Sequence, residues 1–438
     1  MEYISTNKKA PPVNFRSAVF SNVPPDGGLY MPASFPQIPV HELKGASYTE
    51  VAAEALYPFV EGEIPRSELE AMAKRAYPFA PVIVKIDEGL YMMDLGAGTL
   101  TDSFKDYGVR MQAEFVRYYG NEDLTILSIT SGDTGPAVAK AFGGNGIRTV
   151  VVFDERNISD VQRRQMTTVP NVVAIGAKND FSHLYSVGKE VENHPSLKGK
   201  LLSANSRNIG RLLGQIPYHI YGHSNVEGGK RVILSIPFGN GGNFVSAEMA
   251  RRMGLRIPML IAATNANDVF RRFVETGRYE PRPTIPTISS AMDVSDPGNM
   301  PRFVYMHGGT MDVNRNISHP PDMHGIRAVT HAVSITDAQT IETIRRAYRQ
   351  RGILIDPHGG VALAGAEQFR RVNPEHASTP IIFEETATPS KFPQTMEKIV
   401  GFAPEPTESM QREALMKENI IHVGELTPKK LLEVLQAR

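Results

Sequence analysis

Short apolar runs that alternate with helical patterns constrain the fold of this chain most. The candidate strands are Leu124–Ile129, Thr149–Phe153, Val172–Ile175, Val232–Ile236, Pro258–Ala263 and Pro380–Phe383. Helical patterns lie between most of them, including Pro136–Phe142, Ile209–Tyr221, Val245–Met253 and Asp337–Arg351. Uniformly apolar strands separated by helices are typical of parallel sheets that are covered on both faces. The sequence therefore predicts an α/β fold.

The N-terminal part of the chain differs from this pattern. Residues 1–39 are rich in proline and glycine, which predicts extended chain and turns. Two helices are expected next, one over Tyr48–Val60 and one that begins near Pro65, where Ser67-x-x-Glu70 has the spacing of a capping box. We expect an N-terminal segment at 1–90, a smaller α/β domain at 91–215 and a larger one at 216–438.

Composition excludes several classes of function. The 438 residues include no cysteine, which rules out disulfides, thiolate metal sites and a cysteine nucleophile. Lys and Arg number 47, as do Asp and Glu, so the global basicity that drives non-specific nucleic-acid binding is absent. We find neither a membrane-spanning apolar run nor the apolar core of a signal peptide. We expect a cytoplasmic protein with no nucleic-acid, membrane or metal partner.

Ligand sites of α/β folds lie at the carboxyl ends of strands, and the loop Thr130–Gly135 directly follows a predicted strand. Its hydroxyl side chains and glycines would let backbone amides at a helix start face a carboxylate or phosphate. An ordinary turn, with Asp133 or Thr134 as the helix N-cap, explains the same residues. The loop alone leaves both interpretations open.

A second loop, Phe238–Asn243, contains three glycines in four positions and opens the next helix. Such a loop permits close backbone approach and suits a phosphate group. It lacks the Gly-Lys-Ser/Thr of a Walker loop, and the following strand ends in Thr264-Asn265 rather than in an acid. The sequence therefore disfavours NAD and favours another phosphate-bearing ligand.

A third segment, Thr101–Asp106, places Lys105 at the start of an amphipathic stretch. The positive end of a helix lowers the pKa of a lysine, and a neutral amine can form a Schiff base. An exposed lysine in a first helical turn would be the ordinary alternative. A lysine for an aldehyde, a cradle for a phosphate and a loop for a carboxylate together suit pyridoxal phosphate with an amino-acid substrate.

Ordered blocks along most of the chain resemble the threonine synthase family. They are Asp26–Tyr30, Ser103–Asp106, Thr130–Gly135, Ser203–Ser206 with Arg211, Ala262–Asp268, Ser290–Ser295 and Thr386–Phe392. The resemblance implies two doubly wound domains of the fold type II, tryptophan synthase β-like kind, preceded by an N-terminal segment. It also implies conversion of O-phospho-L-homoserine and water to L-threonine and phosphate by a monomer or homodimer.

The resemblance implies a role for individual residues. Lys105 would hold the cofactor and move protons between carbon atoms of the substrate, and Thr386 would bond the pyridine nitrogen. The cofactor phosphate would be bound by Gly239, Asn240, Gly241, Gly242 and Asn243. The substrate carboxylate and the ring hydroxyl would be surrounded by Ser131, Asp133 and Thr134. Candidates for the substrate phosphate are Arg211, Arg110 and Asn205.

Several positions depart from the family pattern. Gly98 and Thr388 stand where the family usually has histidines, and Gly241 stands where a phenylalanine is usual. Glu384-Glu385 precedes Thr386 where a glycine is common. Two alternatives therefore remain open. One is a related phospho-lyase that gives 2-oxobutanoate, ammonia and phosphate. The other is a non-catalytic relative that binds a ligand or a protein partner, against which the presence of Lys105 argues.

Overall fold

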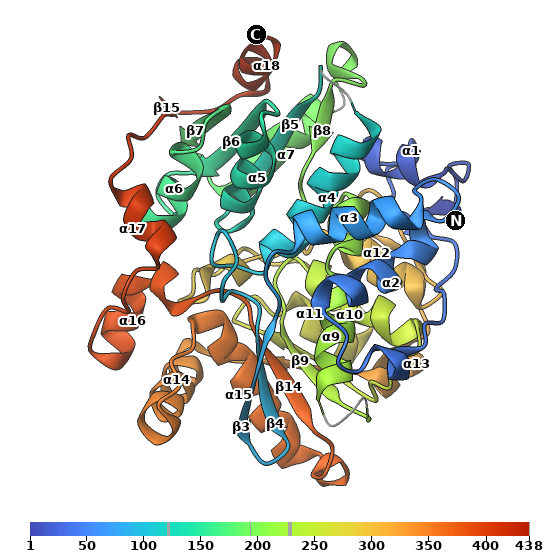
Figure 1. Cartoon of the computed structure of the whole chain (residues 1–438), viewed down its shortest axis with the longest axis vertical. Helices are drawn as coiled ribbons and strands as arrows, with labels where there is room; N and C mark the ends of the chain where they lie inside the picture. The colour runs from blue at the N-terminus through green and yellow to red at the C-terminus, as the bar shows by residue number, and fades with distance from the viewer. Residues whose placement is uncertain (121–122, 193, 227–229, 438) are drawn as a thin grey trace.

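Two large sheets organise the chain, one in the upper and one in the lower half of Figure 1. The computed structural model describes residues 1–120, 123–192, 194–226 and 230–437. The upper sheet is parallel throughout, with strands in the order β15 (Ile420–Val423), β7 (Val172–Ala177), β6 (Thr149–Asp154), β5 (Thr125–Thr130) and β8 (Leu201–Ser203).

The lower sheet has six strands in the order β13 (Thr330–Ser334), β10 (Leu260–Thr264), β9 (Ile233–Pro237), β14 (Ile381–Glu385), β4 (Leu90–Asp94) and β3 (Val82–Asp87). Only the edge strand β3 runs antiparallel to its neighbour in this sheet. The strands β9, β10 and β14 are buried along their whole length, as expected for parallel strands covered on both faces. The predicted α/β class is confirmed.

Most predicted elements lie within a residue or two of the observed ones. The predicted helix at Asp337–Arg351 is α14, and Val245–Met253 falls in α10 (Gly242–Arg252) with one residue beyond its end. The single helix expected at Ile209–Tyr221 is wrong, because α8 (Ile209–Leu213) ends before α9 (Ile216–Asn225) begins. Pro217, in the first turn of α9, lacks the N–H that would bond the carbonyl of Leu213 in a continuous helix.

The N-terminal segment contributes α1 (Phe15–Phe20), α2 (Tyr48–Val60) and α3 (Arg66–Ala76), which pack beside α4 (Lys105–Tyr119) and α9. The ring centroid of Phe15 lies 4.9 Å from that of Phe115 on α4. Asn208, just before α8, donates its side-chain amide to the carbonyl of Val19 at 2.7 Å. This segment therefore supports two elements that reach the pocket described below.

The predicted capping box at Ser67 is wrong, since Ser67 lies inside α3, whose N-cap is Pro65 and has no side-chain cap. A capping box is present one helix earlier, where the Ser47 hydroxyl accepts from the Glu50 N–H and the Glu50 carboxylate accepts from the Ser47 N–H. The Ser-x-x-Glu spacing occurs at both places. Proline at 65 allows α3 to begin earlier than the pattern at Ser67 indicates.

Replacement of Ser47 by alanine is expected to lower the free energy of unfolding by about 1 kcal/mol, because the cap of α2 is lost. Replacement of Ser67 by alanine should change it by less than about 0.5 kcal/mol, since that exposed side chain caps nothing. Urea denaturation of both variants measures the difference. Equal losses would contradict this assignment of the cap.

Sheet membership differs from the expected ranges 91–215 and 216–438. Strand β15 comes from the C-terminal part of the chain but pairs with β7 in the upper sheet. The helix that follows, α18 (Pro428–Gln436), packs on α7 (Phe181–Glu192), and Leu431 and Leu435 join the core of that half. Strand β3 also lies before residue 91 yet extends the lower sheet. The division into domains itself stays a prediction.

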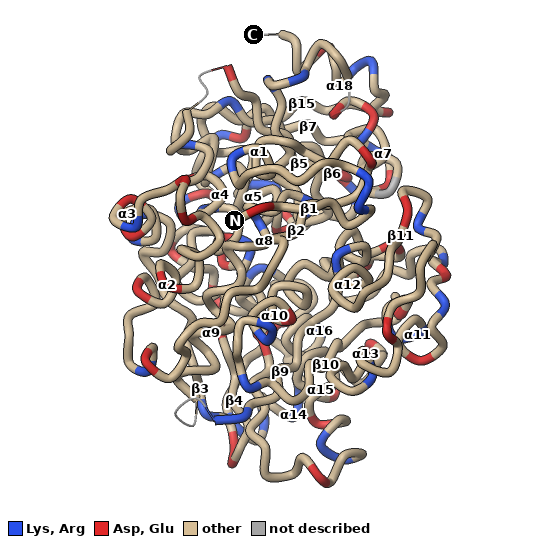
Figure 2. Tube along the Cα trace, turned by 90° about the vertical axis from the view of Figure 1, so that its right-hand side faces the viewer, with Lys and Arg blue, Asp and Glu red and all other residues tan. Residues whose placement is uncertain are grey.

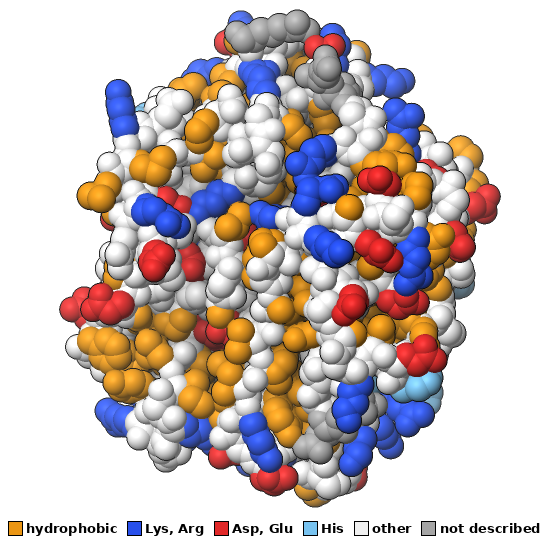
Figure 3. All heavy atoms as spheres, viewed as in Figure 1, with side chains coloured by type: hydrophobic (Ala, Val, Ile, Leu, Met, Phe, Trp, Pro, Cys, Tyr) orange, Lys and Arg blue, Asp and Glu red, His pale blue; other side chains and the backbone are white. Residues whose placement is uncertain are grey.

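Charged residues are spread through the chain rather than gathered in one part of it. In Figure 2, Lys and Arg are interspersed with Asp and Glu over the whole molecule. On the face in Figure 3, both signs are intermixed among polar and apolar side chains. This arrangement agrees with the net charge of zero. Within the residues described, no helix combines the length and the apolar character needed to cross a bilayer.

Candidate active site between the two sheets

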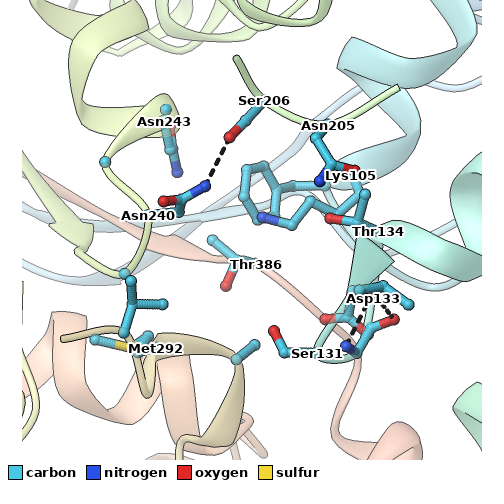
Figure 4. A pocket seen from close by; sticks show the side chains of 18 of the residues that line it. Lys105, Ser131, Asp133, Thr134, Asn205, Ser206, Asn240, Asn243, Met292 and Thr386 are labelled. Atoms are coloured by element: carbon cyan, nitrogen blue, oxygen red, sulfur yellow. Dashed lines mark hydrogen bonds between the residues drawn. The ribbon is translucent and has the colours of Figure 1, made fainter. Parts of the chain in front are cut away.

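A pocket lies where the carboxyl ends of strands from both sheets meet. Figure 4 shows Lys105 and Thr134 on one side, Asn240 and Asn243 on the other, and Thr386 between them. Twelve of the thirteen candidates from the sequence line the pocket: Lys105, Ser131, Asp133, Thr134, Asn205, Arg211, Gly239, Asn240, Gly241, Gly242, Asn243 and Thr386. The fold thus brings together loops that are far apart in the sequence.

Lys105 is the first residue of α4 and is partly buried, not an exposed surface lysine. Burial, together with the nearby cations Arg211 and Lys391, lowers the pKa of its ammonium group to about 7, although Asp133 opposes the shift. The sequence also predicts a lowered pKa for Lys105. The largest cause, however, is burial and not the helix terminus. A large fraction of this amine is therefore neutral near pH 7 and can act as a nucleophile.

The glycine loop before α10 offers unpaired backbone amides. Gly241 has φ +75°, a left-handed conformation that disfavours other residues, and serves as the N-cap of α10. In the described part of the chain, the N–H groups of Gly239, Asn240 and Gly241 have no acceptor, and those of Gly242 and Asn243 lie in the first helical turn. Such a set of amides at a helix N-terminus fits a phosphate group.

The two asparagine side chains of this loop bind protein groups instead. Asn240 donates its amide to the Ser206 hydroxyl at 2.7 Å, a contact drawn in Figure 4. Asn243 donates to the buried carboxylate of Glu384 at 2.6 Å and accepts from the Tyr218 hydroxyl at 2.9 Å. The backbone amides of these two residues, and not their side chains, are therefore the groups available to an anion.

The loop after β5 presents two hydroxyl groups to the pocket. Thr130 stabilises the loop internally, because its hydroxyl accepts from the N–H groups of Gly132 and Gly135 at 3.0 and 3.1 Å. The hydroxyls of Ser131 and Thr134 have no hydrogen-bond partner among the described residues and line the pocket. They are available to an acceptor such as a carboxylate.

Arg211 is a buried cation with no carboxylate within ion-pair distance among the described residues. Its Nη1 donates to the carbonyl of Ala204, and its Nε finds no partner in the described part of the chain. Burial lowers the pKa of this guanidinium to about 10. Beside it, Asn205 accepts at its Oδ1 from the N–H of Ile129 at 3.3 Å, and its side-chain amide hydrogens bond to none of the described residues. An uncompensated buried cation of this kind is stabilised by a bound anion.

Arg110 does not reach the pocket, so the prediction that it binds the substrate phosphate with Arg211 is corrected. Its guanidinium donates to the carbonyls of Arg75 and Ala76 at 2.6 and 2.5 Å and so caps the C-terminal end of α3. Arg110 lies five residues after Lys105 on the same helix, which places it about 140° around the helix axis. The two side chains therefore lie on different faces of α4.

Sequence reasoning missed several residues of the site. Ser206, Met292 and His358 also line the pocket, and the Nε2 atom of His358 accepts from the N–H of Ala291 at 3.1 Å. Lys391, fully buried, contacts the pocket residue Asp133. The blocks at Ser203–Ser206, Ser290–Ser295 and Thr386–Phe392 contained three of these residues but did not mark them individually. By contrast, neither Gly98 nor Thr388 lines the pocket.

Comparisons with known proteins agree with this geometry. Residues 85–380 match the family model described as pyridoxal-phosphate dependent enzyme, and residues 2–77 match that of the threonine synthase N terminus. The threonine synthase of Haemophilus influenzae is 34% identical over 397 residues, which cover 89% of each chain. The crystal structure of threonine synthase from Escherichia coli gives a TM-score of 0.89 at 28% identity, covering 99% of both chains.

A solved threonine synthase from Brucella melitensis, bound to pyridoxal phosphate, has a TM-score of 0.89 at 29% identity and covers 99% of this chain and 98% of its own. The fold and the pocket define a pyridoxal-phosphate dependent enzyme of fold type II, which confirms the expected cofactor. Within that class, the chain belongs to the threonine synthase family.

Proposed function

We propose that this enzyme converts O-phospho-L-homoserine and water to L-threonine and phosphate, with Lys105 as its catalytic lysine. The observation that carries the proposal is that two sets of donor groups without partners among the described residues line one pocket. The glycine loop at Gly239–Asn243 offers backbone amides, and Arg211 with Asn205 offers a buried cation and a free amide. A phosphorylated cofactor and a phosphorylated amino acid would occupy these two positions together.

Pyridoxal phosphate, when bound, supplies an electron sink for the carbon atoms of an amino-acid substrate. The glycine-loop amides would hold its phosphate, and the Thr386 hydroxyl would face its ring nitrogen as a neutral partner. The amine of Lys105 would hold the cofactor and afterwards accept and return protons at the substrate carbons. A pKa of about 7 suits an amine that must do both near neutral pH.

The substrate would be oriented by its two charged ends. The hydroxyls of Ser131 and Thr134, at the start of α5 (Thr134–Phe142), would bind its carboxylate. Arg211 and the Asn205 amide would bind its phosphate and stabilise that group as it leaves. Water addition after phosphate loss needs the same lysine to serve more than one carbon, which a flexible side chain at a helix start allows.

The depressed pKa of Lys105 predicts the pH dependence of cofactor attachment. Only the neutral amine attacks an aldehyde, so the rate at which pyridoxal phosphate attaches to the apoprotein should rise with pH and level off above about pH 7. Stopped-flow absorbance over a pH series measures this rate. A rate that keeps rising towards pH 10, as for an ordinary lysine, would contradict the assignment.

The phospho-lyase remains the second candidate because Gly98 and Thr388 replace histidines that are usual in the family. Both positions lie outside the residues that line the pocket, and Thr388 bonds instead to Ser390, with its hydroxyl 3.2 Å from that of Ser390. The presence of Lys105 in the pocket argues against a non-catalytic relative, and the similarity to threonine synthases favours the synthase over the lyase.

Phosphate release from O-phospho-L-homoserine tests the substrate assignment. The holoenzyme should release phosphate continuously, and the apoprotein should do so only after pyridoxal phosphate is added. O-phospho-L-serine, which is one carbon shorter, is the matched control and should react at least about tenfold more slowly, because its phosphate falls short of Arg211. Absence of phosphate release, or release without cofactor, would contradict the proposal.

The remaining expectations stay predictions. A cytoplasmic location, a monomeric or homodimeric state and the absence of nucleic-acid partners are expected from the sequence, and the balanced charge supports the last of these. Sedimentation at several protein concentrations would determine the oligomeric state. A change of sedimentation on addition of duplex DNA would contradict the expectation about nucleic acids.

A further inference from the structure

Lys391 is a lysine with 0% solvent exposure, at the end of the short helix η6 (Pro389–Lys391). Its ammonium group lies 2.7 Å from the Oδ1 of Asp133 and donates to the carbonyl of Thr101 at 2.6 Å. It does not line the pocket, but both of its partners belong to the loops that carry pocket residues. A buried ammonium group depends for its stability on the carboxylate with which it is paired.

Asp133 presents a difficulty for a pocket that binds an amino acid. It lines the pocket between Ser131 and Thr134, the residues assigned to the substrate carboxylate. Although burial raises the pKa of Asp133, Lys391 and the Gln162 amide, 2.9 Å away, outweigh burial and hold it below its usual range. An anionic side chain at this place would repel a second carboxylate unless its charge were cancelled.

We propose that Lys391 is a positioning residue that cancels the charge of Asp133, so that the loop after β5 can receive the carboxylate of the substrate. This inference rests on the proposed function. The two residues form a neutral pair inside the wall of the pocket. The hydroxyls of Ser131 and Thr134 then face a substrate carboxylate without a competing negative charge.

The backbone holds Lys391 in a fixed relation to Lys105. The segment before η6 runs antiparallel to the segment before α4: the Phe104 N–H donates to the Thr386 carbonyl at 2.9 Å, and the Thr388 N–H donates to the Asp102 carbonyl at 3.0 Å. Ser103 and Ala387 form a bridge between these two bonds. These backbone hydrogen bonds therefore fix the segment that leads to Lys391 relative to the segment that leads to Lys105.

The charged groups around Lys391 and Asp133 predict the direction in which each substitution changes the pKa of Lys105. Lys105 is faced by Arg211 and Lys391, which lower its pKa, and by Asp133, which raises it. His358 also acts on Asp133, and Asp102 is a further carboxylate close to Lys391. Removal of Lys391 should raise the pKa of Lys105, and removal of the Asp133 charge should lower it. Removal of both should leave it near the wild-type value.

The test compares Lys391→Met, Asp133→Asn and the double variant as apoproteins. Each is mixed with pyridoxal phosphate over a pH series and reduced with borohydride, and the fraction labelled at Lys105 is measured by mass spectrometry. We expect the midpoint of labelling to move to higher pH in Lys391→Met and to lower pH in Asp133→Asn, and to return in the double variant. Lys391→Arg, which keeps the charge, should stay near wild type.

Binding of O-phospho-L-homoserine gives a second readout. The KM of Lys391→Met should rise more than about tenfold because Asp133 is left uncompensated, and the double variant should recover most of that loss.

Unshifted midpoints of labelling in folded variants, or a double variant with a higher KM than both single variants, would overturn the inference. If Lys391→Met fails to fold, the double variant and Asp133→Asn still show whether the midpoint of labelling moves in the expected direction. Absence of labelling at wild-type Lys105 would instead contradict the proposed function.

Discussion

Replacement of Lys105 by alanine is expected to abolish covalent attachment of pyridoxal phosphate and to reduce turnover at least about a thousandfold. Besides Lys105, the pocket is lined by Arg211 and His358, and neither a guanidinium nor an imidazole can replace the amine that attaches the cofactor covalently. The variant should remain folded, since Lys105 lies at a helix end and makes no ion pair among the described residues. Borohydride reduction, peptide mapping and phosphate release measure the two effects.

Lys44→Ala is the control for this experiment, because Lys44 is exposed and lies outside the pocket. It should retain labelling and turnover close to wild type. Attachment of the cofactor to another lysine, with turnover retained in the Lys105→Ala variant, would contradict the catalytic role. Retained cofactor binding without covalent attachment would not contradict that role, because the glycine loop can still hold the cofactor phosphate.

Replacement of Arg211 by methionine should lower kcat/KM for O-phospho-L-homoserine about a hundredfold, because the substrate phosphate loses a desolvated cation. Competitive inhibition by inorganic phosphate should weaken in parallel. Thermal unfolding monitors the loss of the buried contact with Ala204. A variant that unfolds more readily but keeps its kcat/KM would show that Arg211 is structural.

Arg110→Met provides a matched comparison, because Arg110 lies on the neighbouring α4 and was an equal candidate before the fold was known. Its guanidinium bonds the carbonyls at the end of α3, so the variant should lose about 1 kcal/mol of stability and little kcat/KM. Equal kinetic losses at Arg110 and Arg211 would contradict the assignment of the substrate phosphate.

The buried central strands could be predicted from the sequence because each is a short run of apolar residues. Strands β9 and β14 lie within two residues of their predicted bounds. Strand β8 has only three residues, and β15 has four, none of them fully buried, so neither has a strong pattern. The register of β15 on β7 depends on contacts across more than two hundred residues of sequence, which local patterns do not contain.

The loops of the site were recognisable because each is contiguous and follows a strand. Arg110 was a wrong choice that helix geometry could have prevented, since five residues bring a side chain to another face. Lys391 and Glu384 were not recognisable, because their partners Asp133 and Asn243 lie more than a hundred residues away. Buried charges of this kind are identified by what they contact in space, and their spacing in the sequence carries no signal.

The balance of products from O-phospho-L-homoserine tests the central claim most directly. Holoenzyme and substrate are incubated together, and phosphate, L-threonine and 2-oxobutanoate are quantified in the same samples. This account predicts one L-threonine for each phosphate released, with little 2-oxobutanoate, because Lys105 would serve more than one substrate carbon and neither Gly98 nor Thr388 lines the pocket. Phosphate released with 2-oxobutanoate and no L-threonine would contradict it and would identify the enzyme as the phospho-lyase.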